Sequence, residues 1–197
     1  THHVHGLGNS SGLVGRNYMV HNSTFFMLVD PRRRNPVNFQ KTLGMNDWYL
    51  PGGDRKFPLG SLQMLGKLQG PMLKAARRWL PMPVADYVGQ HSVDVYLTTE
   101  DVPDPENRVE VGPSGRILVH WKTNNLVTHR EFVRRTAHVF RRIGYPLILT
   151  QRMDIAVNSH MCGTAVMGDD PARSVLNASC RTHDLDNLWV VDSSCFP

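Results

Sequence analysis

Two stretches decide the fold class: SVDVYLTT at residues 92–99 and THREFVRRTAHVFRRIG at residues 128–144. In the first, apolar and polar side chains alternate with the two-residue period of a strand that buries one face. In the second, apolar side chains recur every three to four residues opposite a set of arginines, which is the pattern of an amphipathic helix. Thr128 is placed to be its N-cap, Glu131 follows three residues later, and Gly144 ends it. The sequence therefore predicts a protein of strands and helices together, of the α/β or α+β class.

Further strands are expected on both sides of these stretches. The run Phe25–Val29 is short and apolar and a proline follows it, which indicates a buried strand. Residues 109–111 and 117–121 flank a turn of glycine, proline and serine, so we expect an antiparallel hairpin. Leu188–Val191 is a continuous apolar run that ends at Asp192, as in a strand covered on both faces.

The remaining segments are expected to be irregular or helical. Residues 1–24 predict a loop with one short helical turn over 17–21, and residues 31–60 predict an irregular excursion. Leucines near helical spacing predict a helix over residues 62–76, kinked around Gly70 and ended by the Pro-Met-Pro stretch that follows.

The composition is that of a globular protein. The chain has 197 residues, 41% of them hydrophobic and 20% charged, with a net charge of +5. These values exclude intrinsic disorder, collagen and a coiled coil, and no apolar run approaches the ~20 residues that span a bilayer. Three cysteines exclude a disulfide scaffold and leave the compartment open. Because the chain starts without Met and stops just after an apolar run, we expect it to be part of a longer protein.

Metal binding is one alternative that the residues raise. A superficial likeness to a four-ligand zinc site is made by His160, Cys162, Cys180 and His183. The first two are separated by a single residue, whereas paired zinc ligands usually have two to four residues between them. Three histidines at positions 2, 3 and 5 are explained as solvated polar residues. No metal site is predicted, and a zinc module stays an alternative.

Nucleotide and nucleic-acid binding are weighed in the same way. The glycines of residues 6–12 have no strand before them and the wrong spacing for a dinucleotide-binding turn, which favours an ordinary loop. Arginine clusters occur at residues 32–34, 77–78, 134–135 and 141–142. They lie far apart in the chain without a recognised nucleic-acid fold signature, so no nucleic-acid partner is predicted and such a module is the weaker alternative.

The C-terminal segment carries the most specific pattern. It reads NSHMCGTAVMGDDP at residues 158–171 and RTHDLDNLWVVDSSCFP at residues 181–197. A His followed by Gly-Thr and Met-Gly, and then a run ending Val-Asp-x-Ser-x-x-Pro, strongly resembles the C-terminal signature of the glucose-methanol-choline (GMC) family of flavin oxidoreductases. Residues 14–21, 41–49 and 100–109 resemble further landmarks of that family in the same order. The resemblance covers essentially the whole chain.

The resemblance implies a fold and a division into domains. GMC enzymes combine a flavin-binding Rossmann-like domain with an antiparallel-sheet substrate domain that covers the flavin, and both are expected to be truncated in this chain. Residues 1–24 would be the loop region leading from the missing FAD domain. Residues 25–150 would form the substrate-binding domain, and residues 151–197 would return to complete the FAD-binding domain.

The resemblance also implies an activity: FAD-dependent oxidation of the CH–OH group of an alcohol or sugar. An alcohol gives up hydride readily only as its hydroxyl proton is removed, so such a site needs a base beside the carbinol. His160 matches the family's active-site His, which assists that proton's removal. Asp192 matches the residue near the ribityl and phosphate region of the flavin, and Gly163 and Thr164 match the turn near the isoalloxazine. A structural buried His and a strand-end cap are the respective alternatives for His160 and Asp192.

The chain also departs from the family pattern. The glycine-rich phosphate loop has no counterpart here, and the family's second catalytic His or Asn would lie beyond Pro197. We therefore expect the chain by itself to bind FAD weakly or not at all and to be inactive. The implied partners are a small-molecule alcohol or sugar and an electron acceptor, for which oxygen, a quinone and a cytochrome are all open. A non-catalytic GMC-like domain is the main alternative function.

Overall fold

The computed structural model describes residues 6–50, 52–53 and 57–197, and its chain divides into two compact units. The sheet unit comprises the described residues of Asn22–Glu100 and Asn125–Val157. The loop unit comprises the described residues up to His21, together with Asp101–Asn124 and Asn158–Pro197.

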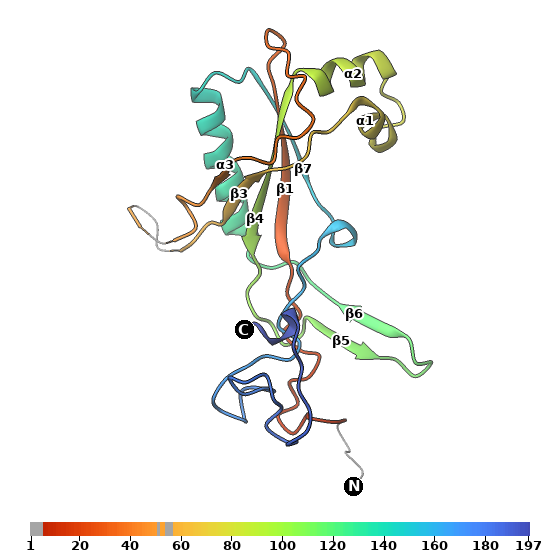
Figure 1. Cartoon of the computed structure of the whole chain (residues 1–197), viewed down its shortest axis with the longest axis vertical. Coiled ribbons are helices and arrows are strands. Elements are labelled where there is room, and N and C mark those ends of the chain that lie inside the picture. Colours follow the sequence, from red (N-terminus) through yellow and green to blue (C-terminus); the bar gives the residue numbers. More distant parts are fainter. Residues whose placement is uncertain (1–5, 51, 54–56) are drawn as a thin grey trace. The chain divides into compact units, whose positions relative to one another are not determined.

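A five-stranded sheet with strand order β2-β3-β4-β1-β7 is the frame of the sheet unit (Figure 1). Its strands are β1 (His21–Val29), β2 (Gly44–Met45), β3 (Ser61–Met64), β4 (Ser92–Glu100) and β7 (Leu147–Arg152). The pairs β2–β3, β3–β4 and β1–β7 are antiparallel, with Leu62 opposite Leu97 and Phe26 opposite Thr150. The strands expected over 25–29 and 92–99 are thus confirmed, whereas β7 had not been predicted.

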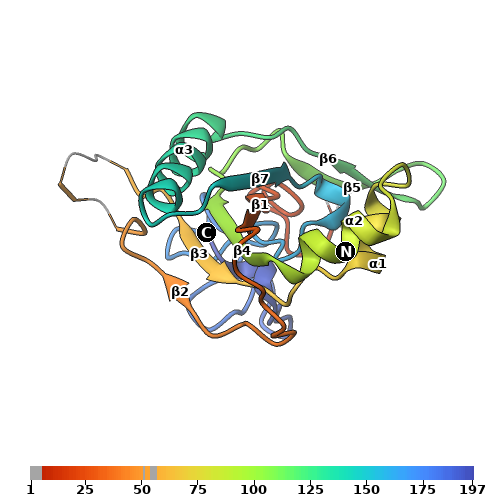
Figure 2. The same cartoon turned by 90° about the horizontal axis from the view of Figure 1, so that it is seen from above.

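The helix α3 (Leu126–Arg142) packs along one face of this sheet (Figures 1 and 2). It places Phe132, which is fully buried, against Phe26, Leu28 and Leu97 of β1 and β4. Burying a large aromatic side chain among aliphatic ones is worth several kcal/mol, so this contact fixes the helix on the sheet.

The ends of α3 differ in how well the sequence predicted them. The helix begins two residues before Thr128, and its N-cap is Asn125, which is left-handed and makes no side-chain cap hydrogen bond. The side chain of Asn125 instead donates to the carbonyl of Glu100, 2.8 Å away. Gly144 follows the helix with φ +101°, so the expected C-terminal glycine is confirmed.

Two short helices, α1 (Gly70–Ala76) and α2 (Met82–Gln90), pack against each other (Figure 2). The predicted helix over 62–76 is therefore wrong before Gly70: its first residues belong to strand β3, and residues 65–69 are in neither a helix nor a strand. Leu62 and Met64 both face the core with a period of two, and tertiary packing overrides their near-helical spacing. The Pro-Met-Pro stretch begins α2 instead of ending a helix, because proline is tolerated in a first turn.

The loop unit contains one hairpin and long stretches without regular structure. Strands β5 (Arg108–Val111) and β6 (Ile117–His120) pair antiparallel, with Val111 opposite Ile117, as predicted. The short 3-10 turns are η1 (Ile155–Val157), at the end of the sheet unit, and η2 (Ser193–Cys195). A small apolar core in the loop unit is formed by Ala165, Val175, Leu176 and Cys195.

Two local predictions for the loop unit are wrong. Residues 17–21 form no helical turn, because Met19 pairs as a β-bridge with Cys162 and His21 begins β1. Leu188–Val191 is not a strand covered on both faces: only Trp189 forms a bridge, to Arg181, and Val191 is 80% exposed.

The structure as a whole combines helices with an antiparallel sheet, as the sequence predicts. Within residues 6–50, 52–53 and 57–197, we find no helix with both the length and the apolar character required to cross a membrane.

Candidate active site

The His160–Thr164 turn is held between two other segments of the loop unit. On one side, Cys162 and Met19 exchange two backbone hydrogen bonds of 3.0 Å, and Gly15 N donates to the carbonyl of Thr164 at 2.8 Å. On the other side, the Ser193 hydroxyl donates to the carbonyl of Met161 at 2.6 Å. The backbone of the turn that carries His160, Gly163 and Thr164 is thus fixed by hydrogen bonds to its main chain.

Gly163 is at the point of closest approach in this turn. Its φ is +91°, and a Cβ added there would lie 2.1 Å from the carbonyl oxygen of Asn17. Both the backbone angle and the space therefore require glycine at this position. The Gly-Thr pair of the sequence pattern has a physical cause, which is the pairing of this turn with the segment around Asn17.

His160 lies exposed on the same turn with φ +64°, an uncommon conformation for a residue with a side chain. Its Nδ1 is 2.8 Å from Nε2 of His21, and the two ring centroids are 5.0 Å apart. His160 is thus not a histidine buried against a backbone partner. An exposed non-glycine residue in a strained conformation, held by another side chain, is typical of a functional position.

His21, the partner of His160, was singled out by the sequence only as the end of a family landmark. It is half-buried, and burial, followed by the neighbouring His160, lowers the pKa of His21. Its carbonyl accepts a hydrogen bond from Nδ2 of Asn158 at 3.0 Å. The only signal in the sequence was the VGRN stretch with a histidine four residues after it, which does not reveal a contact across 139 residues.

Asp192 lies at the start of the η2 turn. Its Oδ1 accepts hydrogen bonds from the backbone N and the hydroxyl of Ser194, at 2.8 and 2.5 Å. These bonds hold the pKa of the Asp192 carboxyl below its usual value. The residue is exposed, and across the described part of the chain Oδ2 has no hydrogen-bond partner, so one carboxylate oxygen caps the turn while the other can accept a bond from a ligand.

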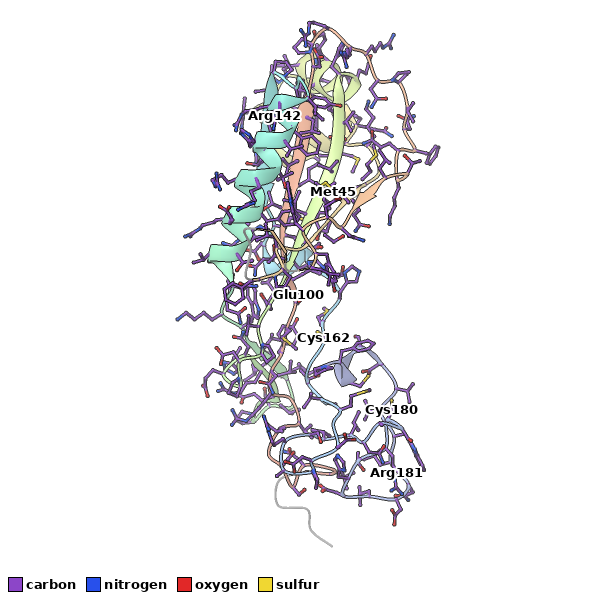
Figure 3. All side chains as sticks on the ribbon, turned by 90° about the vertical axis from the view of Figure 1, so that its left-hand side faces the viewer. Met45, Glu100, Arg142, Cys162, Cys180 and Arg181 are labelled. Carbon is purple, nitrogen blue, oxygen red and sulfur yellow. The ribbon has the colours of Figure 1, made fainter. Side chains whose placement is uncertain are left out.

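The residues that resembled a zinc site are not assembled into one. Figure 3 shows Cys162 and Cys180 on different segments of the loop unit, and Nε2 of His183 lies 2.9 Å from the hydroxyl of Ser174. Among the residues that the structure describes, no group of three or more His, Cys, Asp or Glu side chains could hold a metal ion.

The arginines of α3 form its solvent-facing side. Arg134 and Arg135 both donate to Glu131, at 2.6 to 2.8 Å, and this pairing lowers the pKa of Glu131 to about 2. Arg142 lies at the C-terminal end of the helix (Figure 3). These side chains follow from an amphipathic helix on a sheet and need no nucleic-acid partner to explain them.

Comparison with known proteins points to the same family as the sequence pattern. Residues 107–197 match a family model described as GMC oxidoreductase. The chain is 28% identical to the fructose dehydrogenase large subunit of Gluconobacter japonicus over 94% of this chain and 37% of that protein. It is 26% identical to the paromamine 6'-oxidase of Streptomyces fradiae, over 98% of this chain and 36% of that protein.

A third relative is the 2-methyl-1,2-propanediol dehydrogenase of Mycolicibacterium austroafricanum, 25% identical over 98% of this chain and 39% of that protein. The chain thus spans less than two fifths of the length of these relatives. The matches support the assignment of this chain to the C-terminal portion of a GMC oxidoreductase: the family model covers residues 107–197, and the relatives extend the similarity over nearly the whole chain. Members of this family are oxidoreductases and generally depend on FAD.

Proposed function

We propose that the protein to which this chain belongs is an FAD-dependent oxidoreductase that oxidises the CH–OH group of an alcohol or sugar, with His160 as a catalytic residue. The observation that carries the proposal is the position of His160. It is the histidine of the family pattern, it is exposed, and it is held in a strained conformation beside a glycine turn.

The chemistry assigns His160 a specific task. A neutral imidazole nitrogen can accept the hydroxyl proton of a bound alcohol near neutral pH, which raises the electron density on the carbinol carbon. FAD, when bound, would supply the acceptor for the hydride that this carbon then releases. After the transfer, His160 would hold the proton and donate a hydrogen bond to the carbonyl oxygen of the product.

The residues of the loop unit fit a cofactor that carries hydroxyl groups. Oδ2 of Asp192 can accept a hydrogen bond from a ribityl or ribose hydroxyl, while Oδ1 keeps the turn in place. Gly163 and Thr164 follow on the His160 turn, and the next residue joins this turn to the Asp192 segment, since Ala165 N donates to the carbonyl of Ser194 at 2.9 Å. We therefore propose Asp192, Gly163 and Thr164 as cofactor-binding residues.

The functional division of the chain stays a prediction. We propose that residues 25–150 serve the substrate, and that residues 1–24 and 151–197 belong with a Rossmann-like FAD-binding domain. The chosen substrate class covers the named relatives, which act on a sugar, on paromamine and on a diol according to their names. Two of those names are dehydrogenases and one is an oxidase, so oxygen, a quinone and a cytochrome all stay open as electron acceptors.

The test uses the chain expressed with its natural flanking sequence. The purified protein should show the absorbance bands of a flavin, and these bands should bleach without oxygen when one member of a panel of alcohols and sugars is added. A colourless protein that FAD does not restore would refute the proposal and favour a non-catalytic GMC-like domain.

A further inference from the structure

The contact between His160 and His21 determines more than the position of the His160 ring. A hydrogen bond between two neutral imidazoles needs one nitrogen with a proton and one without. The bond joins Nδ1 of His160 to Nε2 of His21, at 2.8 Å. Which ring donates decides whether Nε2 of His160, the nitrogen that is left, can accept a proton from a substrate.

The proposed role of His160 sets the direction of this bond. For Nε2 of His160 to accept the proton of a substrate hydroxyl, the single proton of its neutral ring must be on Nδ1. Nδ1 of His160 then donates to Nε2 of His21, which lies 2.8 Å away. His21 is half-buried, and burial favours its neutral form, in which one ring nitrogen has a lone pair to accept this bond.

The main chain of His21 is tied to the same segment as its ring. Nδ2 of Asn158 donates to the carbonyl of His21 at 3.0 Å. Asn158 is two residues before His160 in the chain and therefore ties the two histidine-bearing segments together. His21 is thus held twice by the segment that carries His160: through its carbonyl by Asn158 and through Nε2 of its ring by His160.

We propose that His21 is a positioning residue that fixes His160 in the tautomer with the proton on Nδ1, leaving the lone pair of Nε2 free to accept the hydroxyl proton of the substrate. This inference rests on the proposed catalytic role of His160. In a base that is oriented by a second group, the wrong tautomer removes activity even when the ring stays in place. His160 therefore depends on a residue that lies 139 positions earlier in the sequence.

The direct test reads the tautomer and needs no substrate. The protein is labelled with 15N-histidine, and the two ring nitrogens of His160 are assigned by two-bond 1H–15N correlation at a pH where both imidazoles are neutral. We expect a protonated Nδ1 and an unprotonated Nε2 at His160. In His21→Leu the acceptor is lost, and His160 should change to the Nε2-protonated form that a free imidazole side chain favours.

Two further variants separate positioning from folding. His21→Gln can place an amide oxygen near the lost Nε2 and should keep the proton on Nδ1 of His160. His138→Leu changes an exposed histidine of α3 and should leave the His160 signals unchanged. An Nε2 proton on His160 in the unmodified protein, or an unchanged tautomer in His21→Leu, would overturn the inference.

Activity of the flavin-loaded protein with its natural flanking sequence gives the second readout. We expect His21→Leu to lower kcat/KM by about 10- to 100-fold, mainly through kcat, and His21→Gln to recover most of the loss. Full activity in His160→Ala would refute the proposed function itself. A large loss in His160→Ala together with no loss in His21→Leu would refute only the role of His21.

Discussion

Replacing Gly163 with alanine tests the claim that the His160 turn is fixed by its contact with the segment around Asn17. The backbone angle alone, φ +91°, should cost about 1 kcal/mol for a residue with a Cβ. The new Cβ would stand 2.1 Å from Asn17 O and 2.7 Å from Cε of Met19, so the carbonyl has to retreat by about 1 Å. Overpacking of this kind costs a further ~1 to 3 kcal/mol, which gives a total of about 2 to 4 kcal/mol.

Gly115→Ala is the matched control for this variant. Gly115 belongs to the same unit and has φ +75°, but no described atom lies within 4 Å of its added Cβ. It should therefore show the angular cost alone, about 1 kcal/mol. Amide hydrogen exchange at Met19 and Cys162, whose backbones pair, measures the local loss directly. If the two variants weaken these amides equally, the close approach at Gly163 does not hold the turn.

Three other predictions concern the sheet unit and the cap of the last turn. Phe132→Ala should lower the free energy of unfolding by ~3 to 5 kcal/mol in urea denaturation, because it empties the core under α3, whereas Val127→Ala on the exposed side of the same helix should change it by under about 0.5 kcal/mol. His129 is buried between Thr24 and Thr99, and burial lowers its pKa to about 4. Below about pH 6.5 the unfolded state binds a proton that the folded state does not, so the free energy of unfolding should fall by about 2 to 3 kcal/mol between pH 6.5 and 4.5. His129→Gln should remove this part of the pH dependence. Asp192→Ala should cost about 1 kcal/mol of stability and Asp192→Asn much less, because an amide oxygen can still cap the turn. If the charge of Asp192 serves the cofactor, both variants should weaken FAD binding by the complete protein in a fluorescence titration. Equal FAD affinity in the unmodified protein and both variants would remove Asp192 from the site.

The sequence predicted those strands and helices whose apolar pattern or turn residues lie within one short stretch of the chain. The alternation over Ser92–Thr99 and the apolar stripe of α3 each describe one buried face, and both elements formed as expected. The hairpin of β5 and β6 followed from its turn residues. The strand β3 was mistaken for helix because a four-residue strand with leucines near it has no period long enough to read.

The candidate site divides in the same way. His160, Gly163 and Thr164 stand in one short motif and Asp192 in a second one near the end of the chain, so the sequence could select them before any contact was known. The partner His21 could not be found in that manner, because its role depends on a bridge between Met19 and Cys162 that joins distant segments. The exposure of Val191 was missed since an apolar run alone does not tell which of its faces is covered.

The most direct test of the central claim is the rate at which a substrate reduces the flavin without oxygen, compared between the complete protein and its His160→Ala variant in a stopped-flow experiment. We expect both forms to bind FAD, and the variant to be reduced ~10² to 10⁴-fold more slowly, since it lacks the base that takes the hydroxyl proton. Equal rates of flavin reduction in the two forms would contradict the assignment of His160 as the catalytic residue.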